Sequence, residues 1–149
     1  MAQQPKMRVM KPSDLDAIVG IDEQTSRQNR REYYERKLAV LLDKTHTINS
    51  SLVAEIDGKV AGFVMGDIYF GEFGIPETSA TIDTLGVDPA KQNHGIASDL
   101  MEQFIMNMKA AGVNKIYTLV NWDDFALERF FSRHKFVPSK RINLELTLP

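Results

Sequence analysis

Residues 52–69 constrain the fold more than any other part of the sequence. In residues 52–56, the apolar Leu52, Ala54 and Ile56 alternate with the residues between them, which predicts a β-strand. Asp57-Gly58 follows at once, and this dipeptide between two strand-like runs is typical of a two-residue hairpin turn. The return run KVAGFVMGDIY predicts a second strand at 59–69. We therefore expect the chain to build around an antiparallel sheet.

Helical and strand-like patterns alternate in the rest of the chain. Further strands are expected at 7–10, 79–87, 115–120 and 141–148, and helices at 14–24, 28–43, 94–111 and 124–134. The strand at 141–148 is expected because its leucines and isoleucine alternate with polar residues. The order β-α-α-β-β-β-α-β-α-β predicts an α/β (α+β) fold with one mixed central sheet of about six to seven strands flanked by about four helices. Since no linker interrupts the pattern, we expect a single domain over residues 1–149.

The composition excludes several classes of protein. Eighteen basic and twenty acidic residues give a net charge of −2, which argues against nucleic acid or a membrane surface as the main partner. The absence of cysteine excludes disulfides, thiolate metal sites and a cysteine nucleophile. Because the histidines form no cluster either, we expect no metal site. Neither a signal segment nor a membrane-spanning run is visible, so a cytoplasmic location is expected.

The stretch VDPAKQNHGIASDL, residues 87–100, has the pattern of an anion site. A predicted strand ends at Val87, and the chain enters a helix through residues 92–97. The first amides of a helix have no partner within it, and the helix dipole places partial positive charge there, so a pyrophosphate is well served. Gly95 and Ala97 would allow a ligand close to the backbone, or else they merely ease packing of the helix on the sheet.

The same stretch resembles the acyl-CoA loop of the GNAT superfamily of N-acyltransferases. The pattern V-x-P-x-x-(Q/R)-x-x-G-x-(G/A) is met by Val87, Pro89, Gln92, Gly95 and Ala97. Residues 52–66 are similar to the central hairpin of that family, and residues 126–136 to its penultimate helix. The resemblance therefore extends over nearly the whole chain.

The resemblance implies that acetyl-CoA is the acyl donor and that a primary amine attacks it directly in a ternary complex. Family members hold the donor in a V-shaped gap between two central parallel strands, with the pyrophosphate on the loop amides and the pantetheine arm on the preceding strand. A strand amide near Leu85 would serve the oxyanion. The implied cofactor-binding residues are Leu85, Gly86, Val87, Gln92, Asn93, His94, Gly95, Ile96, Ala97, Ser98, Asp123 and Phe131.

Two carboxylates are candidates for the base that removes a proton from the amine. Asp83 is the first, because strand alternation would place Thr81, Asp83 and Leu85 on one face, toward the gap. Its alternative role is to brace a neighbouring arginine or loop. Glu72, in a glycine-rich loop, is the second candidate and a candidate for acceptor binding; its alternative is an exposed loop acid.

Some residues depart from the family pattern. Phe131 stands where many members have a tyrosine that protonates the leaving thiolate, and phenylalanine cannot donate a proton. Tyr69 and Tyr117 are the other candidate donors, although each is more often a packed strand residue. Asp123 stands where an asparagine commonly contacts the pantetheine arm, and Asn93 where glycine is common. A non-catalytic acyl-CoA-binding module is therefore the alternative function.

The acceptor is an amine-bearing small molecule or protein. Arg30, Tyr33 and Tyr34 lie in the segment where the family's variable helices line the acceptor side. The alternative for these three is a solvated helix face with a core tyrosine. Family members are often dimers, and the expected strand at 141–148 offers an edge for a homodimer.

Overall fold

The structure, a computed structural model, describes residues 4–43 and 49–149. The chain forms two compact units, Met1–Leu119 and Val120–Pro149. The first unit contains the sheet and three of the described helices, and the second contains the last helix and the C-terminal segment.

The described strands of the first unit form a mixed sheet in the order β1-β2-β3-β4-β5. The strands are β1 (Lys6–Val9), β2 (Leu52–Ile56), β3 (Lys59–Phe70), β4 (Thr78–Val87) and β5 (Lys115–Thr118). The first four pair antiparallel, and β5 runs parallel to β4. The predicted hairpin is confirmed: Ile56 pairs with Lys59, and both residues of the Asp57-Gly58 turn have positive φ, as a type I′ turn requires.

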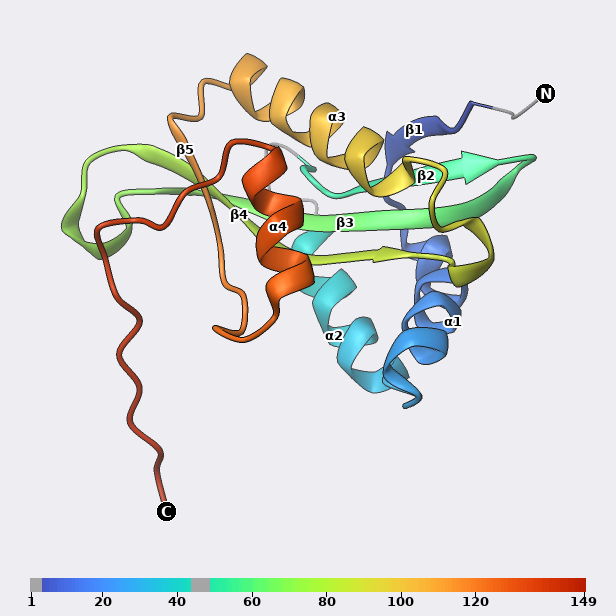
Figure 1. Ribbon diagram of the computed structural model, residues 1–149, viewed down its shortest axis with the longest axis horizontal. Coiled ribbons are helices and arrows are strands. Elements are labelled where there is room, and N and C mark those ends of the chain that lie inside the picture. The colour runs from blue at the N-terminus through green and yellow to red at the C-terminus, as the bar shows by residue number, and fades with distance from the viewer. Residues whose placement is uncertain (1–3, 44–48) are drawn as a thin grey trace. The chain divides into compact units, whose positions relative to one another are not determined.

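Helices cover both faces of this sheet (Figure 1). The helices α1 (Leu15–Ser26) and α2 (Arg31–Leu41) lie on one face, and α3 (Ile96–Ala110) lies on the other. Short 3₁₀ helices precede α1 and α3, at Pro12–Asp14 and Pro89–Lys91. The mixed α/β architecture is thus the one that the element order predicted.

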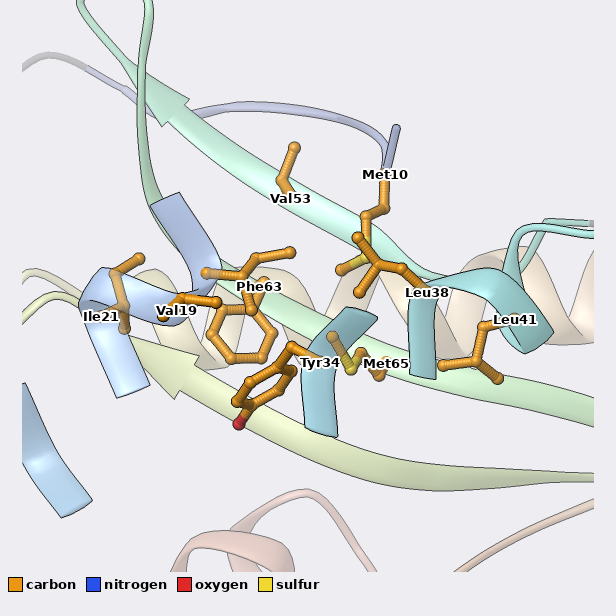
Figure 2. Packing of buried hydrophobic residues seen from close by; sticks show 10 residues of the cluster. Met10, Val19, Ile21, Tyr34, Leu38, Leu41, Val53, Phe63 and Met65 are labelled. Carbon is orange, nitrogen blue, oxygen red and sulfur yellow. The ribbon is translucent and has the colours of Figure 1, made fainter. Parts of the chain in front are cut away.

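The core between the sheet and the first two helices is apolar and aromatic (Figure 2). Tyr34 and Leu38 of α2 are buried against Phe63 and Met65 of β3. The rings of Tyr34 and Phe63 meet edge to face, with centroids 6.2 Å apart. On the other face, α3 buries Met101 and the four residues that its period of four predicted: Ile96, Leu100, Phe104 and Met108.

The second unit contains α4 (Phe125–Arg133), which begins where the Asp124 side chain accepts a hydrogen bond from the Leu127 amide at 3.1 Å. The strand predicted at 141–148 is wrong: this segment has no strand pairing, and its four large apolar side chains are 78% to 84% exposed. Alternation decides which face a strand would bury, but a strand also needs a neighbour for its backbone hydrogen bonds. The described sheet therefore has five strands rather than six or seven.

Candidate functional site

The centre of β4 contains one residue more than the facing part of β3. Thr84 pairs with Met65 and Ile82 pairs with Gly66, so Asp83 is an extra residue that has no pairing partner on β3. This is a β-bulge, a feature that bends a strand, increases its twist and often accompanies a functional site.

The bulge changes the face to which Asp83 points. Ile82 and Leu85 pair with residues two apart on β3, so these two β4 side chains share a face although they are three positions apart. Asp83 lies on the opposite face, where its carboxylate accepts a hydrogen bond from Lys37 of α2. The expectation that Leu85 shares a face with Thr81 and Asp83 is wrong, because simple alternation does not count an inserted residue.

At the same bulge β4 loses its parallel neighbour. The pairing of β4 with β5 ends at Ile82 and Thr118, where the Thr118 hydroxyl donates to the Ile82 carbonyl at 3.0 Å. β4 itself continues to Val87. Its last five residues therefore present an edge that β5 does not cover with strand pairing.

Hydrogen-bond alternation shows which backbone groups lie on that edge. The Asp88 amide donates to the Ala61 carbonyl at 2.8 Å, so this is a hydrogen-bonded pair of the antiparallel ladder. By alternation, Leu85 and Val87 direct their N–H and C=O groups away from β3, toward the uncovered edge. Gly86 directs its own toward β3, and a Cβ there would lie 2.7 Å from the Phe63 ring. Packing against Phe63 thus explains why residue 86 is a glycine.

The loop after β4 is braced by its own side chains. Asp88 accepts a hydrogen bond from the Ala90 amide at 3.0 Å. The Nδ1 atom of His94 lies 3.1 Å from the Lys91 carbonyl oxygen and 2.9 Å from that of Gln92. Since both neighbours are acceptors, Nδ1 carries the hydrogen and donates. His94 thereby closes the loop on itself.

Two residues of the loop have left-handed backbone. Asn93 has φ 68° and Gly95, which precedes α3, has φ 78°. A Cβ at Gly95 would meet nothing within 4 Å, so conformation and not crowding within the chain calls for glycine here. Asparagine is among the residues that tolerate this region best, which explains how Asn93 replaces the usual glycine.

The N-terminus of α3 presents backbone amides that the helix itself does not pair. The first intrahelical bond runs from the Asp99 amide to the Gly95 carbonyl at 2.9 Å. The N–H groups of Ile96 and Ala97 precede that bond and have no helical carbonyl to pair with. The helix start is held close to β3, because a Cβ on Gly62 would lie 3.0 Å from Ile96.

Around the bulge lies a group of polar and aromatic side chains that we call the Asp83 cluster: Tyr33, Lys37, Asp67, Tyr69 and Asp83. The Lys37 ammonium donates to Asp83 and lies 5.8 Å from the centre of the Tyr33 ring. The hydrogen bond to Asp83 raises the pKa of Lys37. Burial, and then the negative charge of Asp67, raises the pKa of Tyr69, to which Asp83 adds. The sequence did not single out Lys37, and no local signal links it to a carboxylate 46 residues away.

The other residues predicted on the acceptor side have structural partners. Arg30 donates to both oxygens of Asp22, and its guanidinium carbon lies 5.6 Å from the Tyr33 ring centre. Tyr34 is fully buried in the core, and burial raises the pKa of its phenol. Glu72 is exposed in a short 3₁₀ turn, Glu72–Gly74.

Two predicted cofactor residues belong to the second unit. Asp123 is exposed in the turn before α4. Phe131 is buried, with its ring centre 5.4 Å from that of Phe130 and 5.1 Å from that of Phe136. In the first unit, the Tyr117 hydroxyl donates to Glu77 at 3.2 Å.

Among residues 4–43 and 49–149, no group of three or more histidine, aspartate or glutamate side chains is arranged to hold a metal ion. Within the same part of the chain, no helix has the length and apolarity needed to cross a bilayer.

Comparisons with known proteins identify the family and agree with the fold. Residues 16–136 match the model of the acetyltransferase (GNAT) family. The chain is 25% identical over 131 residues to acetyltransferase ECA0875 of Pectobacterium atrosepticum, which covers 88% of this chain and 86% of that protein.

Solved structures share the fold at low identity. AAC(6')-Iy in complex with the bisubstrate analogue CoA-S-monomethyl-acetylneamine has a TM-score of 0.79 at 15% identity, over 99% of this chain and all of that one. A ribosomal-protein-alanine N-acetyltransferase from Brucella melitensis biovar Abortus 2308 has a TM-score of 0.75 at 13% identity, over 98% of this chain and 100% of that one.

Proposed function

Because the chain belongs to the GNAT family of acetyltransferases, which transfer acyl groups from acyl-CoA to nitrogen, we propose that it acetylates a primary amine from acetyl-CoA by direct attack in a ternary complex. One observation carries the proposal: the edge of β4 that β5 leaves at Asp83 is followed, after the loop 88–95, by the N-terminus of α3. An extended amide chain ending in a pyrophosphate suits such an edge and such a helix end.

The donor site is assigned on backbone geometry. The pyrophosphate is bound by the amides of Gly95, Ile96 and Ala97, with the side chain of Gln92 and the first turn at Ser98 beside them. The amide chain of pantetheine pairs with Val87, much as an added strand pairs with a sheet edge. Asn93 and His94 hold the loop in the required shape.

The chemistry is assigned to β4. An alkyl amine is protonated at neutral pH and must lose a proton before it attacks, and Asp83 accepts that proton. The Leu85 N–H, on the uncovered edge, donates to the carbonyl oxygen of the thioester as it becomes an oxyanion. The second proton of the amine nitrogen leaves with the CoA sulfur, since Phe131 has no proton to give. Glu72 remains the second candidate for the base.

The acceptor is assigned to the Asp83 cluster. Two carboxylates, Asp67 and Asp83, suit a cationic amine, and Tyr33, 42% exposed, offers an aromatic face. Arg30 and Tyr34 hold Tyr33 in place, because Arg30 is bound to Asp22 and Tyr34 is buried in the core. The structural neighbours include an enzyme bound to an acetylneamine bisubstrate analogue and a ribosomal-protein-alanine N-acetyltransferase, so both small and protein amines belong in a substrate screen.

We keep four further assignments as proposals. Residues 1–149 form one N-acetyltransferase domain, an assignment that the family match across residues 16–136 supports because it includes most of both units. No metal takes part, and the protein acts in the cytoplasm. The exposed apolar segment 141–148 offers a surface for a homodimer.

The test is to follow release of the CoA thiol from acetyl-CoA with a panel of aminoglycosides, polyamines and peptides with free N-termini. We expect at least one amine to accelerate release over the amine-free rate, with acetylated amine as the product. If CoA binds in calorimetry but no amine accelerates release, the chain is a non-catalytic acyl-CoA-binding module and the proposal fails.

A further inference from the structure

The Asp83 cluster already contains an amine. The Lys37 ammonium donates to the Asp83 carboxylate, the group to which the proposed function assigns the proton of the acceptor. The lysine comes from α2, which packs over this face of the sheet (Figure 1). In the absence of acceptor, Lys37 therefore occupies the position of the acceptor's ammonium group.

We propose that Lys37 is a self-acetylation site, modified by acetyl-CoA bound at the β4 edge of the same chain. The inference rests on the proposed function. Three features carry it: the hydrogen bond to the candidate base, the position of that base at the bulge two residues before the Leu85 amide, and the partial exposure of both side chains, 33% for Lys37 and 29% for Asp83. A lysine has a flexible four-carbon stem, so its amine can turn from Asp83 toward the edge.

The chemistry balances without another reactant. Asp83 takes one proton from the Lys37 ammonium, and the neutral Nζ atom attacks the carbonyl carbon of the thioester. The C–N bond forms, the C–S bond breaks, and CoA leaves as a thiol with the second proton of the nitrogen. Asp83 then releases its proton to water. The product is an uncharged acetyl-lysine, which can no longer form an ion pair with Asp83.

The experiment incubates the purified full-length chain with acetyl-CoA and no acceptor, and follows each lysine by peptide mass spectrometry. Lys59, exposed at the hairpin turn, is the internal control for uncatalysed acetylation. Chemical reactivity alone favours Lys59, because Lys37 is partly buried and its pKa is raised. We expect Lys37 to gain an acetyl group roughly tenfold faster than Lys59, at a rate that dilution of the protein does not change.

Two further arms locate the reaction. Desulfo-CoA, which lacks the reactive sulfur, should suppress labelling of Lys37 but not of Lys59. Asp83→Asn should reduce labelling of Lys37 to the Lys59 rate, and Lys37→Arg, which keeps a cation at Asp83, should abolish the fast phase. Circular dichroism confirms that both variants are folded.

Labelling of Lys37 no faster than Lys59, or unaffected by desulfo-CoA, would overturn this inference. Turnover of the amine panel by the same preparation reports separately on the proposed function. An enzyme that acetylates an added amine but spares Lys37 refutes self-acetylation alone.

Discussion

Two carboxylate–cation pairs tie α2 to its neighbours, Asp22–Arg30 to α1 and Asp83–Lys37 to β4, and they differ in exposure and in hydrogen bonding. Asp22 is 7% exposed and receives hydrogen bonds from two nitrogens of Arg30 and from the Ser26 hydroxyl. Asp83 is 29% exposed; one lysine amine binds it, and the only other donor among the described bonds is the Thr84 hydroxyl at 3.4 Å.

The difference fits a structural role for the Asp22 pair and the functional role proposed for the Asp83 pair. A rigid, forked guanidinium on a buried carboxylate leaves no room for exchange, and the pair connects α1 to the start of α2. A single flexible ammonium on a half-exposed carboxylate is easily displaced by another amine. Both pairs look alike as charges in the sequence, but only the second lies at a bulge beside an uncovered strand edge.

The largest effect should follow from Asp83→Asn. An amide cannot accept the proton of the acceptor, so we expect kcat to fall by about 10²- to 10⁴-fold with little change in CoA affinity. Steady-state rates and calorimetry with CoA measure the two effects. Asp22→Asn is the control, and it should leave kcat within a few-fold of the wild type. Wild-type kcat in the Asp83 variant would assign this carboxylate a bracing role only.

Gly95→Glu should weaken CoA binding by at least roughly 30-fold, because it places bulk and negative charge where the amides of α3 meet the pyrophosphate. Gly112→Glu is a matched control at the other end of α3. Gly112 has φ 81° and Gly95 has φ 78°, and a Cβ at either would meet nothing within 4 Å. The backbone strain is therefore similar, and only the Gly95 variant should lose affinity in calorimetry. Equal losses in both would place CoA elsewhere.

Asp22→Asn should lower the free energy of unfolding by about 1–2 kcal/mol. This is less than the 3–5 kcal/mol typical of a fully buried broken pair, because Arg30 is 41% exposed and can be solvated. Asp83→Asn, whose carboxylate is more exposed, should cost less than about 1 kcal/mol. Urea unfolding of both variants shows which one loses more free energy of unfolding. A larger loss in Asp83→Asn would contradict the assignment of Asp22–Arg30 as the structural pair.

The smallest effect is the dependence of this stability difference on pH. The Arg30 hydrogen bonds, against the opposing effect of burial, hold the pKa of Asp22 below its usual range. A lowered carboxyl pKa stabilises the fold above the unfolded value, near 3.9, and that contribution is lost as pH falls through the folded pKa. The gap between wild type and Asp22→Asn should thus be complete at pH 6 and narrow below about pH 4 in urea unfolding. A gap that stays constant down to pH 2 would show that packing, not charge, accounts for it.

Much of the fold was predictable because its signals are local. The hairpin at Asp57-Gly58 depends on two residues that accept positive φ, and the α3 stripe depends on one apolar residue per turn. The last strand, 141–148, was not predictable, because alternation is a property of the segment whereas pairing is a property of its neighbour. The left-handed turn at Gly95 was predictable because its signal is local, whereas the contact of Lys37 with Asp83 was missed because it joins residues 46 positions apart.

The sequence by itself determined the order of elements as far as α4, the family and the loop at the start of α3, since each is written in adjacent residues. Only the tertiary structure decided the surroundings of Asp83. One extra residue in the register of β4 turned this carboxylate to the face of α2, ended the pairing with β5 and brought a lysine from 46 positions away. Register is set by the packing of whole strands against each other, so no short stretch of sequence contains it.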